Sequence, residues 1–270
     1  MTLREAVLMT ADRLKAVSDA PRDEAKLLAA RAIGAERIGF LELENTVSKD
    51  ALNKLTELVS RRLKREPLQY ILGEQYFMGL RFLAEPCALI PRQDTETLCE
   101  EAVRLIRGRG YRTMLDICTG TGCIAVSVSK LTDIDAEASD ISPDCAALAK
   151  RNAELNGVRL KTRAADLFDG AGRYDIITAN PPYISDTDML SLQEEVKREP
   201  DLALRGGRDG LSFYRRIAAE FMPHINTGGA LLLEVGMGEA RPVAELFRGL
   251  ETDIVKDLNG IDRVVIVYFR

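Results

Sequence analysis

The chain has 270 residues, 46% of them hydrophobic and 29% charged, and a formal net charge of −5, which suits one large or two smaller globular domains. No apolar run approaches the roughly 18 residues of a membrane span, and the acidic balance disfavours non-specific binding to nucleic-acid phosphates. The N-terminus lacks a signal-peptide core, the five cysteines have no CxxC spacing and there is one histidine, so we expect a cytoplasmic protein with reduced thiols and no metal site.

Residues 1–65 are predicted to form a small helical domain. Apolar residues recur at helical spacing, and this periodicity predicts helices over residues 3–17, 21–33, 37–43 and 50–64. The last helix ends in the one basic run of the chain, Arg61–Arg65. This run is either a solvated helix end, where cations favour the helix dipole, or a contact for an acidic partner.

Residues 66–86 are predicted to be a linker that contains a β-hairpin. Pro67 ends the preceding helix, and Gln75–Ala84 has the pattern of two extended segments that turn at Met78-Gly79. Another helix start follows at Pro91. We therefore assign residues 87–270 to a second, larger domain.

Strand and helix patterns alternate from residue 112 onward, which predicts an α/β domain with a mostly parallel sheet and helices on both faces. Seven strands are expected, near residues 112–117, 135–139, 159–164, 174–179, 229–235, 252–258 and 262–269. Helices are expected near residues 122–131, 143–156, 209–222 and 239–249. Asn259-Gly260 is a hairpin signal between the last two strands, so the final strand should be antiparallel.

The first two of these strands end in features that suit a nucleoside. The first runs into Cys118-Thr119-Gly120-Thr121-Gly122, and glycines in such a loop let a ligand approach the backbone. The loop lacks the Lys-Ser/Thr tail of a phosphate-binding loop and the full dinucleotide pattern, and it could also be a tight structural turn. Asp140 ends the second strand, where a carboxylate can accept both ribose hydroxyls or cap the next helix. Together they favour an adenosine that bears a sulfonium amino acid.

The third and fourth strands end in further candidate residues. Asp166 could accept from an exocyclic amine while Leu167 packs on a purine, or the two could belong to a turn and the core. The fourth strand ends at Asn180-Pro181-Pro182-Tyr183, where two prolines remove backbone donors. The Asn180 side-chain oxygen and nearby carbonyl oxygens remain beside an aromatic ring. Such an acceptor-rich site suits a planar –NH2 group.

These motifs together resemble class I S-adenosylmethionine-dependent methyltransferases that act on planar amino or amide nitrogens, for which Asn-Pro-Pro-Tyr is a signature. Three further stretches, Glu66–Gly73, Leu89–Glu96 and Glu199-Pro200, resemble the HemK/PrmC family. Its members methylate the glutamine amide in the Gly-Gly-Gln tip of class-1 peptide chain release factors. The resemblance covers nearly the whole chain. It implies a Rossmann-like seven-stranded methyltransferase domain and a substrate-docking role for residues 1–65.

The resemblance also implies roles for individual residues. The cofactor S-adenosylmethionine would be bound by Cys118, Thr119, Gly120, Thr121, Gly122, Asp140, Asp166, Leu167 and Asn180, with Asp140 at the ribose and Asp166-Leu167 at the adenine. The substrate glutamine amide would be held by Asn180, Pro181, Pro182 and Tyr183, and Arg92 with Thr95 would cap the same cleft. Cys118 stands where many family members have glycine, so the loop cannot rely on a glycine's freedom of φ there.

Other functions stay open at this point. A glutamine methyltransferase for a ribosomal protein would share the tetrapeptide, as would a DNA or RNA amino-methyltransferase, which the net charge and the missing recognition domain disfavour. A non-catalytic cofactor-binding adaptor is disfavoured by the intact tetrapeptide. We expect release factors as protein partners, S-adenosylhomocysteine as the product, no membrane or stable nucleic-acid binding, and a monomer.

Overall fold

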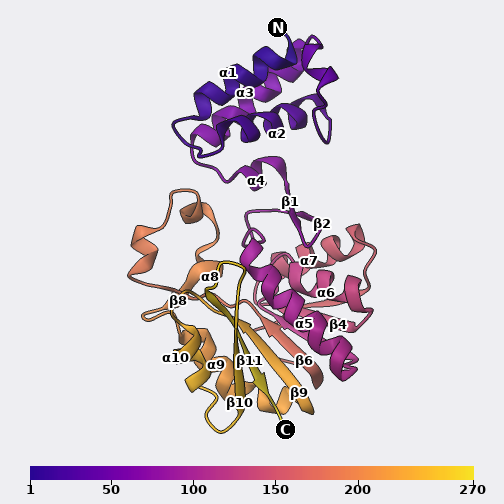
Figure 1. The fold of residues 1–270 in the computed structure, drawn as a ribbon, viewed down its shortest axis with the longest axis vertical. Helices are drawn as coiled ribbons and strands as arrows, with labels where there is room; N and C mark the ends of the chain where they lie inside the picture. The colour runs from indigo at the N-terminus through magenta and orange to yellow at the C-terminus, as the bar shows by residue number, and fades with distance from the viewer. The chain divides into compact units, whose positions relative to one another are not determined.

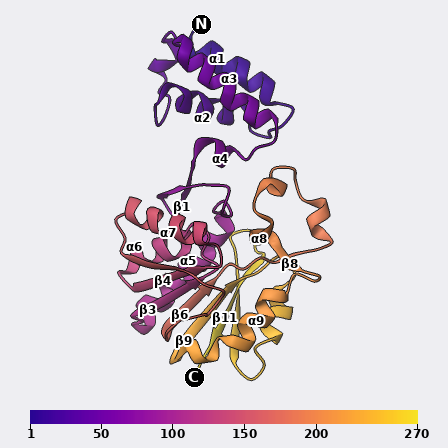
Figure 2. The same cartoon turned by 180° about the vertical axis from the view of Figure 1, so that it is seen from behind.

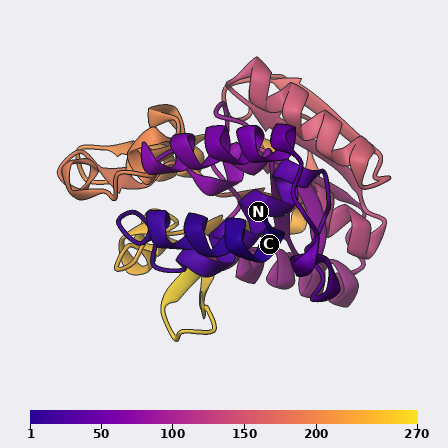
Figure 3. The same cartoon turned by 90° about the horizontal axis from the view of Figure 1, so that it is seen from above.

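Three helices, α1 (Leu3–Leu14), α2 (Pro21–Ile33) and α3 (Lys49–Leu63), pack side by side in the N-terminal part of the computed structural model, which describes residues 1–270 (Figures 1 and 3). Their contact is apolar, and Leu14, Leu28 and Val59 are almost completely buried in it. Local signals set the helix ends. Thr2 forms a capping box with Glu5, Pro21 opens α2, and Ser48 caps α3.

The predicted helix near residues 37–43 is largely wrong. The structure has a 3₁₀ turn at Leu41–Glu44 instead, with Phe40 and Leu41 exposed. This stretch buries no apolar stripe, and such a stripe is the main source of helix stability in proteins. A short helix that was not predicted, α4 (Leu68–Leu72), follows Pro67 and ends at Gly73, whose φ of 77° is in the left-handed region.

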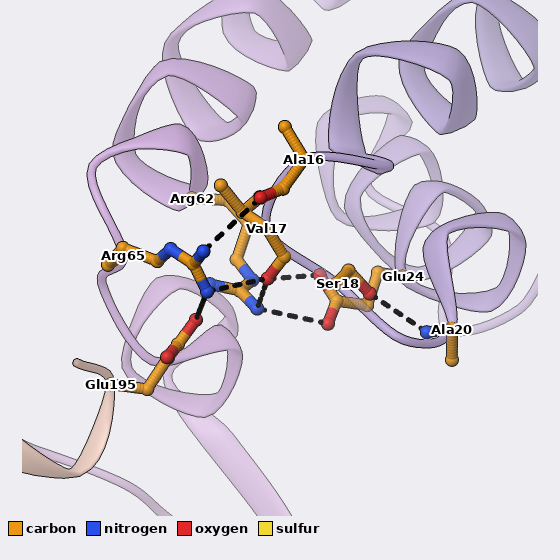
Figure 4. Close-up of polar contacts among 8 residues, drawn as sticks. All are labelled: Ala16, Val17, Ser18, Ala20, Glu24, Arg62, Arg65 and Glu195. Carbon is orange, nitrogen blue, oxygen red and sulfur yellow. Dashed lines mark hydrogen bonds and ion pairs between the residues drawn. The ribbon is translucent and has the colours of Figure 1, made fainter. Parts of the chain in front are cut away.

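The helical unit contains a second, distant piece of the chain. It comprises Met1–Gly73 together with Gln193–Arg198, and the other unit comprises Glu74–Leu192 and Glu199–Arg270. Arg62, 5% exposed, binds both pieces (Figure 4): its Nε donates to Glu24 Oε2 at 2.8 Å and its Nη1 to Glu195 Oε1 at 3.0 Å. Arg65 donates to the same Glu195 oxygen at 3.0 Å. The basic run is therefore not a simple solvated helix end, because Arg62 is buried and forms ion pairs within the helical unit.

Replacing Arg62 with alanine should destabilise the helical unit by about 3 kcal/mol, because it leaves partly buried carboxylates without their cation. Arg62 Nη2 also donates to the Val17 carbonyl at 2.8 Å, and this bond would be lost as well. Denaturant unfolding would measure the loss. Arg65→Ala is the matched control, since the Arg65 side chain is 40% exposed and its ion pair should contribute less than about 1 kcal/mol. Equal losses in the two variants would contradict the prediction.

The second unit is built on a seven-stranded sheet in the order β10-β11-β9-β6-β3-β4-β5. The strands are β3 (Thr113–Ile117), β4 (Asp135–Asp140), β5 (Leu160–Ala164), β6 (Tyr174–Ala179), β9 (Ile225–Glu234), β10 (Glu251–Lys256) and β11 (Asp262–Tyr268). All seven predicted strands are present, and the α/β fold class is confirmed. The last strand, β11, is antiparallel as predicted, but it lies between β9 and β10 and not at the sheet edge.

Helices cover both faces of this sheet (Figures 1 and 2). The helices are α5 (Glu96–Arg109), α6 (Cys123–Thr132) and α7 (Pro143–Leu155) on one face, and α9 (Ser212–Glu220) and α10 (Ala240–Glu245) on the other. Alternate residues of each strand point to opposite faces. Met114 accordingly packs in the core with α5 and α6, and Leu115 packs in the core with α9 and α10.

Short elements complete this unit. The predicted hairpin is present as β1 (Glu74–Phe77) and β2 (Leu80–Leu83). The pattern did not predict the small parallel pair β7 (Ile184–Ser185) and β8 (Arg205–Gly207) or the turn α8 (Asp201–Leu204), which are too short for a periodic signal. The 3₁₀ turns of this unit are Gln93–Thr95, Asp188–Ser191 and Met222–His224, and a further one, Val196–Arg198, lies in the piece that belongs to the helical unit. No helix has the length and apolarity that crossing a membrane demands.

Candidate active site

A cleft lies where β3, β4, β5 and β6 end, at the carboxyl edge that the parallel strands share. Ligands bind at this edge in open α/β sheets. The predicted residues that line the cleft are Cys118, Thr119, Gly120, Thr121, Asp140, Asp166, Leu167, Asn180, Pro182, Arg92 and Thr95. Gly122, Pro181 and Tyr183 were also predicted, but they do not line it. The structure therefore brings most of the candidate residues together from five separate stretches of the chain.

The loop after β3 is shaped by left-handed backbone conformations. Gly120 and Gly122 have φ values of 54° and 79°, and Cys118 has φ 56° without being glycine. The expectation that the loop cannot rely on such a φ at this position is therefore wrong, because Cys118 adopts it at a cost in backbone strain. Gly122 instead permits close packing, because a Cβ atom there would lie 2.8 Å from Ala149 Cβ of α7. Burial raises the pKa of the Cys118 thiol, so this cysteine is not an activated nucleophile.

Asp116 supports this loop through a hydrogen bond from Thr119, and no sequence pattern pointed to this role. It is fully buried in β3 and accepts hydrogen bonds from the Thr119 hydroxyl and, at 2.7 Å, from the Thr178 hydroxyl of β6. Burial raises the pKa of Asp116 to about 7 even though both hydrogen bonds favour the carboxylate. One buried carboxyl therefore joins the loop to the strand that leads to Asn180.

Asp140 is positioned by backbone donors at the end of β4. The Gly120 N–H donates to its Oδ2 and the Ser142 N–H to its Oδ1, both at 2.9 Å. The alternative role as a helix cap is wrong, because the Ser142 hydroxyl is what caps α7 by accepting from the Cys145 N–H. Each Asp140 oxygen keeps a second lone pair that can accept from a ligand hydroxyl.

The residues after β5 form the next wall of the cleft. Leu167 is 4% exposed and has φ 45°, so it is a second strained non-glycine residue in the lining. Asp166 forms an ion pair with Arg216 of α9 at 3.0 Å. Arg216 also lines the cleft, and the sequence did not predict it, because α9 is distant along the chain.

The tetrapeptide after β6 is divided between the cleft and the core. Asn180 lines the cleft, and its Nδ2 donates to Thr95 Oγ1 at 3.3 Å. Pro181 and Pro182 are buried. Tyr183 packs against the core on the α9 and α10 face, and a Cβ atom at Gly206 would lie 2.7 Å from Tyr183 Cα. Gly206 therefore lets the β7–β8 backbone pack directly against Tyr183.

Arg92 is held beside the cleft by a buried acid. It pairs with Glu199, which is 5% exposed and also accepts from the Ile90 N–H at 3.0 Å. Both arginines of the lining are thus neutralised, Arg92 by Glu199 and Arg216 by Asp166. His224 lies outside the cleft lining, where it stacks on Phe168.

This sheet order, with β11 antiparallel beside β9 and a glycine-containing loop and an acid at the ends of β3 and β4, defines a Rossmann-like class I methyltransferase. Residues 5–73 match the PrmC N-terminal domain, and residues 101–207 match the methyltransferase small domain. The release factor glutamine methyltransferase of Geobacter sulfurreducens is 43% identical over 252 residues, covering 90% of this chain and 88% of that protein. The protein of the same description from Cereibacter sphaeroides is 39% identical and covers 98% of both chains. The chain therefore belongs to the release factor glutamine methyltransferase family.

Solved structures show the same fold at low sequence identity. A methyltransferase from Pyrococcus furiosus is 20% identical with a TM-score of 0.52, covering 70% of this chain and 89% of that chain. The hMettl16 catalytic domain is 18% identical with a TM-score of 0.58, and the match covers 79% of this chain and 82% of that chain. These two similarities concern the methyltransferase fold alone.

Proposed function

We propose that this enzyme transfers a methyl group from S-adenosylmethionine to the side-chain amide nitrogen of the glutamine in the Gly-Gly-Gln motif of class-1 peptide chain release factors. The family supports this substrate. The observation that carries the proposal is that Asn180, with its acceptor oxygen, lines the same cleft as the glycine-containing loop and Asp140. A planar amide nitrogen can therefore meet a nucleoside-bound methyl group in one cleft.

The chemistry of the cleft fits S-adenosylmethionine and not a phosphate-bearing cofactor. Both arginines of the lining are already neutralised by carboxylates, so neither is free for a phosphate. Asp140 would accept from the ribose hydroxyls, and Leu167 with Asp166 would flank the adenine. Cys118, Thr119, Gly120 and Thr121 would lie along the methionine part, with Gly122 shaping the loop and Asn180 close by. When bound, the cofactor supplies an electrophilic sulfonium methyl group.

The tetrapeptide would hold the substrate amide. Asn180 Oδ1 and the Pro181 carbonyl oxygen would accept its two N–H groups, Pro182 would close the site, and Tyr183 would pack on the amide plane. An amide nitrogen is a poor nucleophile because its lone pair is delocalised. Two acceptors on its hydrogens raise electron density on nitrogen and stabilise the positive charge that develops there. Holding both reactants in line can contribute on the order of 7–11 kcal/mol.

The docking of a whole protein would supply the specificity that one side chain cannot. We propose that the helical domain of residues 1–65 docks the release factor, that residues 66–86 link it to the catalytic domain of residues 87–270, and that the enzyme works as a monomer in the cytoplasm. The ribosomal-protein alternative differs only in the docked partner. The nucleic-acid alternative would need a free basic surface, and in this chain Arg61, Arg62 and Arg65 are all paired with carboxylates.

A substrate comparison tests the proposed function. The enzyme would be incubated with methyl-labelled S-adenosylmethionine and, separately, with purified release factor, ribosomal proteins or nucleic acid. We expect label only in the release factor, located by mass spectrometry on the Gly-Gly-Gln glutamine. A release factor with Gln→Ala at that site is the matched control and should remain unlabelled. Label in another substrate, or label in the control, would overturn the assignment.

A further inference from the structure

Glu234 is a buried carboxyl group for which the mechanism above has no role. It is the last residue of β9 and is 1% exposed. β9 and β6 are parallel neighbours, and Leu233 of β9 pairs with Ala179 of β6. Glu234 comes directly after Leu233, and Asn180 comes directly after Ala179. Glu234 Oε2 has no hydrogen-bond partner. A buried, incompletely bonded ionisable group costs free energy, so its presence needs a reason.

The partners of Glu234 are the residues that orient Asn180. Thr95 and Asn180 lie close enough to the Glu234 carboxyl group to favour its carboxylate form, and Asn180 Nδ2 donates to Thr95 Oγ1 at 3.3 Å. An asparagine amide carries its donors at one end and its acceptor at the other. Because the Thr95 hydroxyl oxygen accepts from the Nδ2 end, the Asn180 carbonyl oxygen is left free to accept from a ligand.

Other charged and titratable groups surround Glu234. They are Arg263 and Asp94, the thiols of Cys99 and Cys123, and the phenols of Tyr183 and Tyr214. Burial raises the pKa of the thiols and phenols, so these four groups are neutral at pH 7. Arg263 is paired with Asp94 at 3.2 Å and Asp257 at 3.3 Å.

The ionisation of Glu234 falls in the neutral range. Burial raises the pKa of Glu234 to about 7, against the nearby Thr95 side chain and the charge of Arg263, which favour the carboxylate. Burial likewise raises the pKa of Asp116 and of Glu239 to about 7. A pH profile alone would therefore not identify the group, and matched variants are needed.

We propose that Glu234 is a positioning residue for methyl transfer, which acts through Thr95 and Asn180 to orient and polarise the Asn180 carbonyl oxygen. This proposal rests on the proposed function. In this role the carboxylate would accept hydrogen bonds from the Thr95 hydroxyl and the Asn180 amide, and its charge would strengthen the acceptor at the far end of the amide. A protonated carboxyl offers a hydrogen in place of an acceptor and lets the amide turn. Turnover should therefore rise with pH as Glu234 ionises.

Kinetics of Glu234→Gln in the full-length enzyme test this role. We expect kcat to fall on the order of 10- to 100-fold, the loss of one hydrogen bond to a charged group. The affinity for S-adenosylmethionine, measured by calorimetry, and the thermal unfolding temperature should stay near the wild-type values. In the wild-type enzyme kcat should rise with pH with an apparent pKa of about 7. In Glu234→Gln this rise of kcat with pH should be absent.

Glu239→Gln is the matched control, because it removes a carboxyl of similar pKa while keeping an oxygen for the Gly236 N–H that Glu239 Oε2 accepts at 3.0 Å. It should keep the wild-type kcat and the rise of kcat with pH. The proposal is wrong if Glu234→Gln keeps the wild-type kcat and the rise of kcat with pH. It is also wrong if Glu234→Gln and Glu239→Gln both lose that rise. If Glu234→Gln fails to fold, Thr95→Val decides: retained kcat would overturn the proposal, and loss of kcat with unchanged cofactor affinity would support it. Wild-type methylation of the release factor, measured in parallel, tests the proposed function separately.

Discussion

Asn180→Ala should lower kcat by at least about 10³-fold, which corresponds to about 4 kcal/mol of lost transition-state stabilisation. The variant removes the acceptor oxygen that would bind a substrate amide hydrogen more tightly as nitrogen becomes positive. Cofactor affinity should change little, because Asp140, Asp166 and the loop after β3 line the cleft independently of this side chain. Single-turnover methylation of release factor measures the loss, and calorimetry measures cofactor binding.

The control for this prediction is a second asparagine that also donates its amide to a neighbouring side chain. Asn226 Nδ2 donates to Asp175 Oδ1 at 2.8 Å, near the opposite end of β6. Asn226→Ala should therefore keep the wild-type turnover, whatever it costs in stability. If Asn180→Ala retained most of its rate, the tetrapeptide would not be the substrate-amide site.

A short peptide containing Gly-Gly-Gln should be methylated at least about 10³-fold less efficiently, in kcat/KM, than the intact release factor, because it forgoes the binding energy of remote docking. The proposed amide site would take up one side chain, which offers little contact area. Steady-state kinetics with both substrates measures the ratio, and the KM for S-adenosylmethionine should be the same with each. Equal values of kcat/KM for the peptide and the intact release factor would show that docking outside the cleft does not contribute to specificity.

A surface variant can assign this docking to the helical domain. Phe40 and Leu41 are 78% and 86% exposed, and large exposed apolar side chains are candidates for partner contacts. The double variant Phe40→Ser/Leu41→Ser should raise the KM for release factor and leave peptide kinetics unchanged. This variant is a cleaner test than deleting residues 1–65, because such a deletion would leave Glu195 without Arg62 and Arg65. An unchanged KM would mean that these two residues do not dock the substrate.

Much of the fold and part of the cleft could be predicted because their signals are local. These signals are the periodicity of a strand, the Gly and Pro residues that end an element, and the residue at each strand end. Each can be read from about five to ten neighbouring residues. These signals located Asp140, Asn180 and the loop after β3. The recognised motifs added Thr95 and Arg92, which no local pattern would have linked to Asn180.

The residues that were missed are linked to the cleft only by tertiary structure. Asp116 and Glu234 lie inside strands whose apolar pattern hides a single acid, and Arg216 comes from a helix far along the chain. Thr95 was predicted to cap the cleft, but its contact with Glu234 depends on which strands are neighbours. Gln193–Arg198 is likewise grouped with the helical unit only by tertiary contacts, which include the pairing of Glu195 with Arg62, 133 residues earlier.

That grouping has a consequence for how the protein is made. The chain passes from one unit to the other at residues 73, 192 and 198, and not at a single linker. During synthesis the helical unit lacks a piece until residue 198 has left the ribosome, after β3 to β7 have already been made. Until then Arg62 has Glu24 but not Glu195 as a partner. A single protease cut between Gly73 and Glu74 would separate Met1–Gly73 covalently from the rest of the chain, but Arg62 and Arg65 would still pair with Glu195 in Gln193–Arg198, which stays joined to the other unit.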